Sequence, residues 1–256
     1  MNSLTDSIRT NLYAFYDSIS ELCGINTGEQ MPWSVSENMP GFWPRLIYRI
    51  NSDILSPTAS DNFSERVKTV HTPELLIASD ENIRQTDLFL RQQGFYPFAV
   101  WKGMVLTNIP HRTPTVLPGG IEIIRPQSLS DREQWLKIVN TELLAPLKMD
   151  EALLEGILSE PAFKVYILKN KGVGVSTILT FTSKDSTGLY LLATARTEQK
   201  KGYAGLLVQY ILDQYAHGSN NPVILHATQA GEPLYLKLGF KPVNQFYLYR
   251  QLKADQ

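Results

Sequence analysis

The stretch at residues 189–215, LYLLATARTEQKKGYAGLLVQYILDQY, constrains the fold more than any other part of the sequence. It opens with an apolar run, passes through a polar loop at residues 194–201, and continues from Gly202 with apolar side chains at helical spacing. The sequence therefore predicts a strand that leads through a loop into a helix. The first N–H groups of a helix lack partners within it and lie at the positive end of its dipole, so they can bind a phosphate group.

The residues at this junction suit such a ligand. Gly202 allows a close approach to the backbone, Ala204 and Gly205 add little bulk, and Lys200 and Lys201 add positive charge. The pattern indicates a diphosphate site made mainly of main-chain donors. The alternative interpretation is a lysine-rich loop that simply opens a buried helix.

Two motifs resemble those of a known superfamily. Residues 199–204, QKKGYA, fit the Q/R-x-x-G-x-G/A signature of the GNAT acetyltransferases, which bind the pyrophosphate of acetyl-coenzyme A with this loop. Residues 223–228 predict a strand, and residues 229–240, QAGEPLYLKLGF, resemble the helix and the closing Leu-Gly-Phe of the second GNAT motif. The resemblance implies the GNAT acyl-CoA N-acyltransferase fold, an α/β protein with a mixed sheet of the α+β kind.

The length of the chain suits two domains. It has 256 residues, and residues 109–120 contain three prolines and two glycines, which interrupt helices and central strands. We therefore predict an N-terminal domain at residues 1–117 and an acetyl-CoA-binding GNAT domain at residues 118–256.

In the first domain the order strand, helix, Gly-Phe, strand at residues 74–106 repeats the order at residues 223–250. This domain therefore resembles a degenerate GNAT half without a Q-x-x-G-x-A loop, expected to bind no cofactor and to wall one side of the acceptor cleft. Its predicted elements are helices at 4–22, 63–70 and 80–93, strands at 45–50, 74–79 and 100–106, and a loop at 51–62.

In the second domain the pattern predicts alternating strands and helices joined by short turns. The strands are 121–125, 163–169, 173–182, the run that ends at 194, 223–228 and 243–250. The helices are 129–144, 150–158, the one that starts at Gly202 and the one in residues 229–238, with turns at 170–172 and 183–188.

The resemblance implies acetyl-CoA as co-substrate and assigns its binding to a strand end, a loop and one further residue. These are Leu192, Ala193 and Thr194 for the pantetheine arm, Gln199, Lys200, Lys201, Gly202, Tyr203, Ala204 and Gly205 for the diphosphate, and Thr228, which stands where many members carry asparagine. Within the loop, Lys200 is expected to face solvent.

The implied reaction is direct transfer of an acetyl group from acetyl-CoA to a primary amine of a small molecule or peptide. Tyr235 matches the family tyrosine that donates to the departing thiolate, or else packs against Phe240. The sequence does not assign a general base. Glu142, Tyr190 and Glu198 are candidates, and a water chain or an amine that arrives neutral would also suffice. His226 either faces the cleft or is a core histidine with satisfied hydrogen bonds.

Composition excludes several other classes. The net charge of −1 gives no sign of electrostatic attraction to nucleic acid or to an anionic membrane. No apolar run approaches the ~20 residues of a membrane span, and residues 1–10 do not resemble a signal peptide, so we expect a cytoplasmic protein. The histidines show no metal-ligand spacing and there is one cysteine, so no metal and no internal disulfide is expected. A non-catalytic acyl-CoA sensor is the alternative function.

Overall fold

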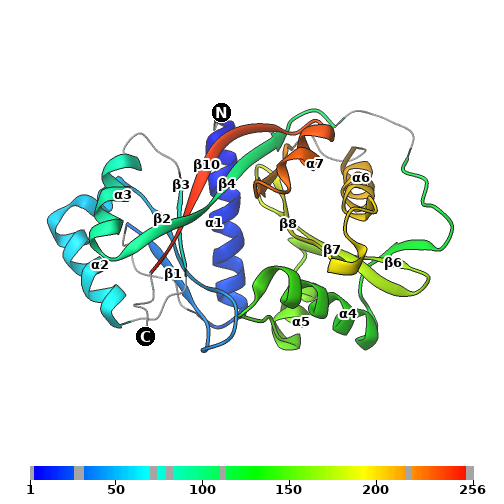
Figure 1. Cartoon of the computed structure of the whole chain (residues 1–256), viewed down its shortest axis with the longest axis horizontal. Helices are drawn as coiled ribbons and strands as arrows, with labels where there is room; N and C mark the ends of the chain where they lie inside the picture. Colours follow the sequence, from blue (N-terminus) through cyan, green and yellow to red (C-terminus); the bar gives the residue numbers. More distant parts are fainter. Residues whose placement is uncertain are drawn as a thin grey trace.

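The computed structural model describes residues 3–25, 32–69, 74–78, 83–109, 114–216 and 221–251. Figure 1 shows their arrangement in two lobes on either side of a long central helix. In chain order the elements are α1 (Leu4–Leu22), β1 (Ser34–Glu37), β2 (Arg45–Ile50), the 3₁₀ helix η1 (Ser52–Leu55), α2 (Pro57–Thr69), β3 (Glu74–Ala78), α3 (Ile83–Gln92), β4 (Phe95–Leu106), β5 (Ile121–Ile124), α4 (Leu129–Val139), the π-helical segment η2 (Asn140–Leu144), α5 (Glu151–Ser159), β6 (Phe163–Asn170), β7 (Val173–Thr182), β8 (Thr187–Thr194), the 3₁₀ turn η3 (Arg196–Glu198), α6 (Tyr203–Ala216), β9 (Val223–Ala227), α7 (Glu232–Lys237) and β10 (Lys241–Gln251).

The strands of the described residues form one ten-stranded mixed sheet in the order β1-β2-β3-β10-β4-β9-β8-β7-β6-β5. The pairs β2/β3 and β8/β9 are parallel, and the other neighbours are antiparallel. This is the mixed α/β architecture that the sequence predicts.

The long strands β4 and β10 run together through the middle of the molecule (Figure 1). The last strand of the chain, β10, lies between β3 and β4, and β4 in turn pairs with β9. The closing strand of each half therefore completes the sheet of the other half. The sequence-based division at residues 117 and 118 remains a prediction, as does the degenerate character of the first half, and the sheet continues across that division.

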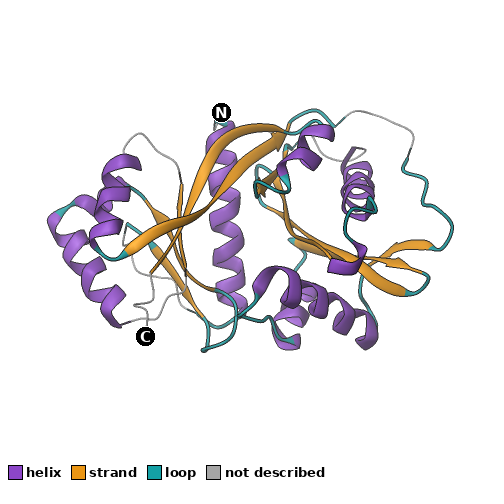
Figure 2. Cartoon of the chain, viewed as in Figure 1, coloured by secondary structure: helices purple, strands orange, loops and turns teal. Residues whose placement is uncertain are grey.

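Helices cover both faces of the sheet (Figure 2). One core cluster joins the sheet to α1, α4 and α5, through residues such as Ile8, Trp135 and Leu154. A second cluster joins the opposite face to α6 and α7, and includes Leu207, Ile211 and Phe240. A third lies under α2 and α3 in the first lobe. Helices α6 and α7, which contain the predicted cofactor motifs, and the N-terminal helix are therefore on opposite faces of the sheet.

Helix α1 begins and ends where the sequence predicts. Ser3 and Asp6 form a reciprocal capping box, which satisfies N–H groups that the first helical turn leaves unpaired. Its apolar side chains Ile8, Leu12, Phe15 and Ile19 recur at three- and four-residue spacing and are buried in the first cluster.

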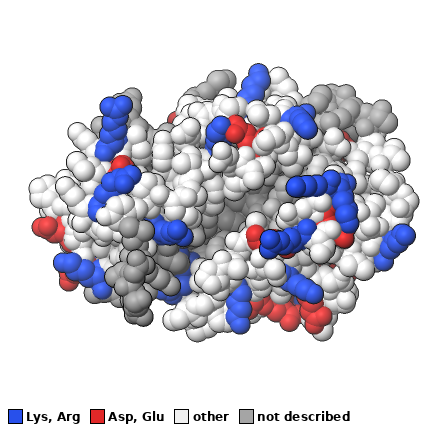
Figure 3. Space-filling view, in the orientation of Figure 1, with Lys and Arg blue, Asp and Glu red and all other residues white. Residues whose placement is uncertain are grey.

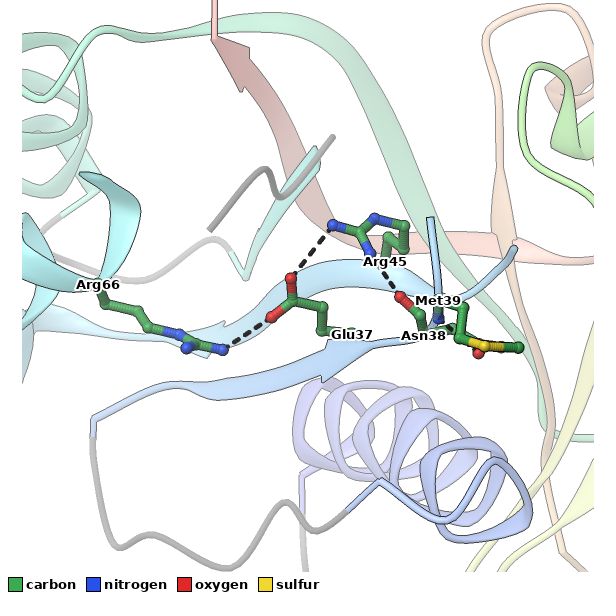
Figure 4. A network of polar contacts seen from close by, with 5 residues as sticks. All are labelled: Glu37, Asn38, Met39, Arg45 and Arg66. Atoms are coloured by element: carbon green, nitrogen blue, oxygen red, sulfur yellow. Dashed lines mark hydrogen bonds and ion pairs between the residues drawn. The ribbon is translucent and has the colours of Figure 1, made fainter. Parts of the chain in front are cut away.

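A polar network fixes the edge of the first lobe (Figure 4). The carboxylate of Glu37 on β1 pairs with Arg45 on β2 at 3.2 Å and with Arg66 on α2 at 3.0 Å. Arg45 also donates to the carbonyl of Asn38, whose side chain accepts from the amide of Met39 at 2.7 Å. Each carboxylate oxygen thus binds a different guanidinium group, so one side chain joins three elements.

Several local predictions need correction. The predicted loop at residues 51–62 is wrong, because η1 occupies Ser52–Leu55 and α2 begins at Pro57. Strand β1 was not predicted, β4 begins at Phe95 instead of residue 100, and the predicted turn at 183–188 is shorter because β8 begins at Thr187. Residues 70, 79–82 and 110–113, which end or begin predicted elements or lie in the predicted boundary, are outside the described residues.

Candidate functional site

The sheet splits between β8 and β9. The two strands pair in parallel at Thr187 with Val223, Gly188 with Ile224 and Leu189 with Leu225, and the ladder ends there. Strand β8 continues to Thr194, at the end of the stretch that the sequence singles out. The edge of β8 beyond Leu189 therefore has no β9 partner among the described residues, and its main chain can bind an extended ligand.

A bulge bends β8 at the start of this split. Leu179 pairs with Tyr190 and Thr177 with Ala193, so Leu191 and Leu192 together face one residue of β7. Leu191 has a φ of 49°, in the left-handed region that costs a non-glycine residue about 1–2 kcal/mol. Such conformations persist where the surroundings enforce them, and they are common at ligand sites.

Side chains hold the end of β8 in place. Ser176 Oγ donates to the carbonyl of Ala193 at 2.7 Å, and Gln199 Nε2 donates to the carbonyl of Thr194 at 3.1 Å. The Gln199 side chain thus closes the loop between β8 and α6. The predicted pantetheine segment and the predicted diphosphate loop are consequently one connected unit.

The loop ends in a helix start that lacks a side-chain cap. Leu206 N donates to Gly202 O at 3.0 Å, which makes Gly202 the N-cap residue, and Gly202 has a φ of 87°. A glycine cannot supply the side-chain oxygen that usually binds the N–H groups of the first turn. Within the described parts of the chain, the N–H groups of Tyr203, Ala204 and Gly205 have no acceptor. They remain available to a ligand.

Charge near this helix start is partly paired. Lys201 Nζ lies 3.0 Å from Glu198 Oε2 with about half of its side chain exposed, and Lys200 is exposed. Glu142, on η2, accepts from the amide of Arg196 at 2.9 Å and so fixes the loop from the other side. Figure 3 shows Lys and Arg interspersed with Asp and Glu on this view of the molecule, which is hollowed near its middle. The loop and helix start at residues 199–205, which we call the cradle, thus offer mainly main-chain donors.

The remaining predicted residues are Thr228, directly after β9, and Tyr235 on α7, next to the cradle. A Cβ atom placed on Gly205 would lie 3.3 Å from Leu234 of α7. Thr228 is exposed, and its hydroxyl accepts from the amide of Gly231 at 3.2 Å. The structure thus brings all the predicted site residues to one end of β8, β9, α6 and α7. Their binding of acetyl-CoA stays a prediction.

Tyr235 is buried, and its ring contacts Phe240 edge to face at a centroid distance of 5.9 Å. Burial raises the pKa of Tyr235 well above its usual range, so the phenol keeps its proton. No group of the described chain accepts a hydrogen bond from its hydroxyl. A protonated phenol without a protein partner can donate to a ligand, although its proposed acid role stays a prediction.

Tyr190 is a poor candidate for the general base. Its hydroxyl donates to Asn11 Oδ1 at 2.7 Å, and its ring stacks on Phe15 at 3.9 Å. Burial raises the pKa of Tyr190 well above its usual value, which disfavours the phenolate. The other two candidates, Glu142 and Glu198, are each held by the partners described above. The structure therefore does not identify a general base among the three candidates.

His226 is not a core histidine with satisfied hydrogen bonds, which is one of the two alternatives that the sequence leaves open. Its ring packs near Phe246, Tyr190 and Trp101, with centroid distances of 4.8, 5.9 and 6.3 Å. Both ring nitrogens are covered, and neither has a hydrogen-bond partner among the described residues. Desolvation lowers the pKa of His226 to about 3, so the imidazole is neutral at physiological pH.

Within the ranges that the structure describes, no group of three or more His, Cys, Asp or Glu side chains is arranged to hold a metal ion. No described helix combines the length and the apolar character needed to cross a bilayer.

Comparisons with known proteins agree with this geometry. The family model described as the acetyltransferase (GNAT) domain matches residues 133–250. The chain has no match among curated proteins.

Solved structures share the fold at low sequence identity. A GCN5-related N-acetyltransferase from Kribbella flavida has a TM-score of 0.66 at 12% identity, covering 99% of this chain and 98% of that one. A GCN5-related N-acetyltransferase from Sphaerobacter thermophilus has a TM-score of 0.62 at 16% identity, covering 82% and 74%. A tandem GNAT protein from the clavulanic acid biosynthesis pathway has a TM-score of 0.55 at 8% identity, covering 89% and 78%. The chain has the GNAT fold, and its residues 133–250 match the acetyltransferase (GNAT) domain family.

Proposed function

We propose that this protein transfers an acetyl group from acetyl-CoA to a primary amine of a small molecule or peptide. The observation that carries the proposal is the set of unpaired N–H groups at Tyr203, Ala204 and Gly205, which follow the N-cap glycine at the end of the loop from β8, the strand that parts from β9. Such a helix start favours a diphosphate group through its main-chain donors and its dipole.

The split in the sheet supports an extended donor. The free edge of β8 at Leu192, Ala193 and Thr194 offers main-chain groups to the pantetheine arm, and the loop from Gln199 to the start of α6 receives the diphosphate. Thr228 lies beside the same end of the site and supplies a hydroxyl. In this arrangement the thioester lies in the split, close to the bulge in β8.

The transfer needs a neutral amine and a protonated leaving group. The amine nitrogen attacks the carbonyl carbon, a C–N bond forms and the C–S bond breaks. The sulfur leaves with the bonding electron pair and takes a proton from Tyr235, while the proton lost by the nitrogen passes to solvent, from which Tyr235 is reprotonated. A main-chain N–H near Ala193 stabilises the negative charge that develops on the carbonyl oxygen.

A non-catalytic acyl-CoA sensor is the second candidate function. It is favoured by one observation, namely that Tyr190 is bound to Asn11 and no carboxylate lies on β8, so the described split has no evident base. A sensor would use the same cradle for binding, without a chemical step.

Two measurements separate these functions. Calorimetric titration with acetyl-CoA tests the cradle, and release of free thiol in the presence of a panel of primary amines tests the transfer. Binding together with amine-dependent thiol release is expected. Binding without release for every amine would favour the sensor, and the absence of binding heat at several temperatures would reject both.

A further inference from the structure

Two partly buried side chains whose nitrogen and oxygen atoms are covered lie together on the α1 face of the sheet. His226 on β9 and Asn244 on β10 are both cross-strand partners of Gly103 on β4. Side chains of directly paired residues point to the same face, and Phe246 and Ile224, on the same faces of their strands, belong to the cluster under α1. His226 and Asn244 therefore flank Gly103 on the face opposite α6 and α7.

The glycine between them leaves room for the side chain of Asn244. A Cβ atom on Gly103 would lie 2.0 Å from Asn244 Oδ1, 3.0 Å from Ile8 Cγ2 and 3.0 Å from Phe246 Cε2. A side chain at position 103 would therefore displace the Asn244 carboxamide from this place. The carboxamide of Asn244 consequently lies directly over the backbone of β4, toward the strand that carries His226.

Neither side chain has its hydrogen bonds satisfied. Both nitrogens of His226 and both the Oδ1 and Nδ2 atoms of Asn244 are covered and lack partners among the described residues. Asn11, another asparagine on this face, is also buried but binds Tyr190, Ser183 and Ser186. Native proteins rarely leave buried polar atoms unpaired, and two such side chains next to one glycine point to a missing ligand.

Their position is the apex of the split. His226 is the first residue of β9 beyond its last pair with β8, and Tyr190, whose ring lies against His226, is the first beyond it on β8. A donor held by the α6 cradle on one face would present its reactive end here. Trp101, which is half-buried, lies beside the His226 ring at a centroid distance of 6.3 Å, so this end of the split reaches the surface at Trp101.

We propose that His226 and Asn244 bind the acceptor amine in its neutral form, and that the acceptor is an arylalkyl or alkyl amine without a carboxylate beside the amine. This inference rests on the proposed function. The neutral imidazole and the carboxamide offer hydrogen-bond acceptors to the amine N–H groups. The surrounding Trp101, Tyr190 and Phe246 rings favour a hydrocarbon skeleton, and a carboxylate buried among them without a cation is strongly disfavoured.

Phenethylamine and phenylalanine test the class of acceptor, because they differ only in the carboxylate. The rate of acetylation is measured as thiol release, at one pH at which part of each amine is neutral. We expect kcat/KM to be at least about tenfold higher for phenethylamine, because the carboxylate of phenylalanine would be buried without a partner. Equal values or a preference for phenylalanine would overturn the proposal.

His226→Phe and Asn244→Leu test the two residues. Because each replacement removes unpaired buried polar atoms, both variants should unfold at the same or a higher temperature than the wild type, whereas Asn11→Leu, the control that removes a paired asparagine, should unfold at a lower one. Both test variants should bind acetyl-CoA as the wild type does and raise KM for phenethylamine about tenfold. Lower stability, or an unchanged KM, would assign the two residues to the core only.

A third measurement tests amine binding independently of acetyl transfer, so that this inference and the proposed function can fail separately. If no amine is acetylated, phenethylamine is titrated into the protein with CoA present, and tryptophan emission is followed in the wild type, in His226→Phe and in Trp101→Phe. A change in the wild type that weakens in His226→Phe supports the amine site even though transfer fails. No change, or the same affinity in His226→Phe, contradicts it.

Discussion

Tyr190 on β8 donates a hydrogen bond of 2.7 Å to Asn11 Oδ1 on α1, in the interior of the protein. The Asn11 amide nitrogen donates in turn to Ser183 Oγ at 2.9 Å and to the carbonyl of Ser186 at 3.1 Å. Both the oxygen and the nitrogen of the Asn11 carboxamide therefore have hydrogen-bond partners. Through this one side chain the N-terminal helix is fixed to the strand that forms one side of the split.

Tyr190→Phe is expected to destabilise the protein by about 1–3 kcal/mol, because it leaves the buried Asn11 Oδ1 without a donor. The free energy of unfolding is measured by urea denaturation. Tyr210→Phe is the control, since the Tyr210 ring packs against Tyr166 and its hydroxyl has no partner in the described chain. Equal stability of the two variants would show that the Asn11 bond contributes nothing.

The exchange of closing strands makes a prediction about fragments. Residues 118–256 contain β9 and β10, but the partners β3 and β4 are in residues 1–117. The isolated fragment of residues 118–256 should therefore lack a cooperative unfolding transition, because β10 would have no neighbour on either side.

Co-expression of residues 1–117 with residues 118–256 should restore a folded complex that elutes as one species and unfolds cooperatively. Circular dichroism and thermal unfolding of each fragment alone and of the pair provide the measurement. A well-folded fragment of residues 118–256 on its own would show that the exchanged strands are dispensable.

Local pattern is sufficient where an element is stabilised by its own neighbours in sequence. Helix α1 is predicted within the right bounds because its apolar spacing and its capping residues are all within the segment. Helix α2 begins at Pro57, before the predicted start at residue 63, because proline is favourable in the first turn of a helix. The partners of β4 and β10 could not be predicted, because each strand fits either half and only distant contacts decide.

In the site, too, local features are predictable from the sequence and those set by distant contacts are not. Gly202 and the following small residues are predictable because their conformational role is local. Nothing in the sequence around Leu191 indicates a positive φ, because pairing with β7 imposes the bulge. Asn244 and His226 become neighbours only through Gly103, on a third strand, so no motif could identify them.

Gly202→Ala is expected to weaken acetyl-CoA binding about tenfold or more. The position has a φ of 87° with no atom within 4 Å of an added Cβ, so the change strains the backbone without a clash and shifts the N–H groups of the helix start. Gly94→Ala is the matched control, with a φ of 82°, equally open space and a position at the end of α3. Calorimetry should find similar losses of stability in both variants and weaker binding only in Gly202→Ala. Weaker binding in both would indicate a general loss of structure.

Tyr235→Phe is expected to lower kcat by roughly 10²–10⁴, the range for loss of a positioned proton donor, while the affinity for acetyl-CoA stays close to that of the wild type. The ring keeps its packing against Phe240, so stability should change little. The Tyr210→Phe variant is again the control and should retain full turnover. Unchanged kcat in Tyr235→Phe would leave this tyrosine with a packing role only.

His226 should control stability in mild acid. Burial lowers the pKa of its imidazole from 6.5 to about 3. Between these values the unfolded chain binds a proton that the folded chain does not, so stability should fall as pH decreases from about 6.5 toward about 3, by an amount on the order of a few kcal/mol. At neutral pH the contribution vanishes because both states are unprotonated.

His226→Phe should remove this loss and keep only the decline below about pH 4 that carboxylates cause. Asp131 is one of these, because hydrogen bonds from Lys169 and Ser128 lower its pKa, so its stabilisation is lost as the pH falls through that lowered value. Urea unfolding at a series of pH values compares the two proteins, and Asn244→Leu, which keeps the imidazole, should follow the wild type. If the wild type and His226→Phe lose stability in parallel between pH 6.5 and pH 4, the imidazole is protonated in the folded protein and its nitrogens are not sealed from water.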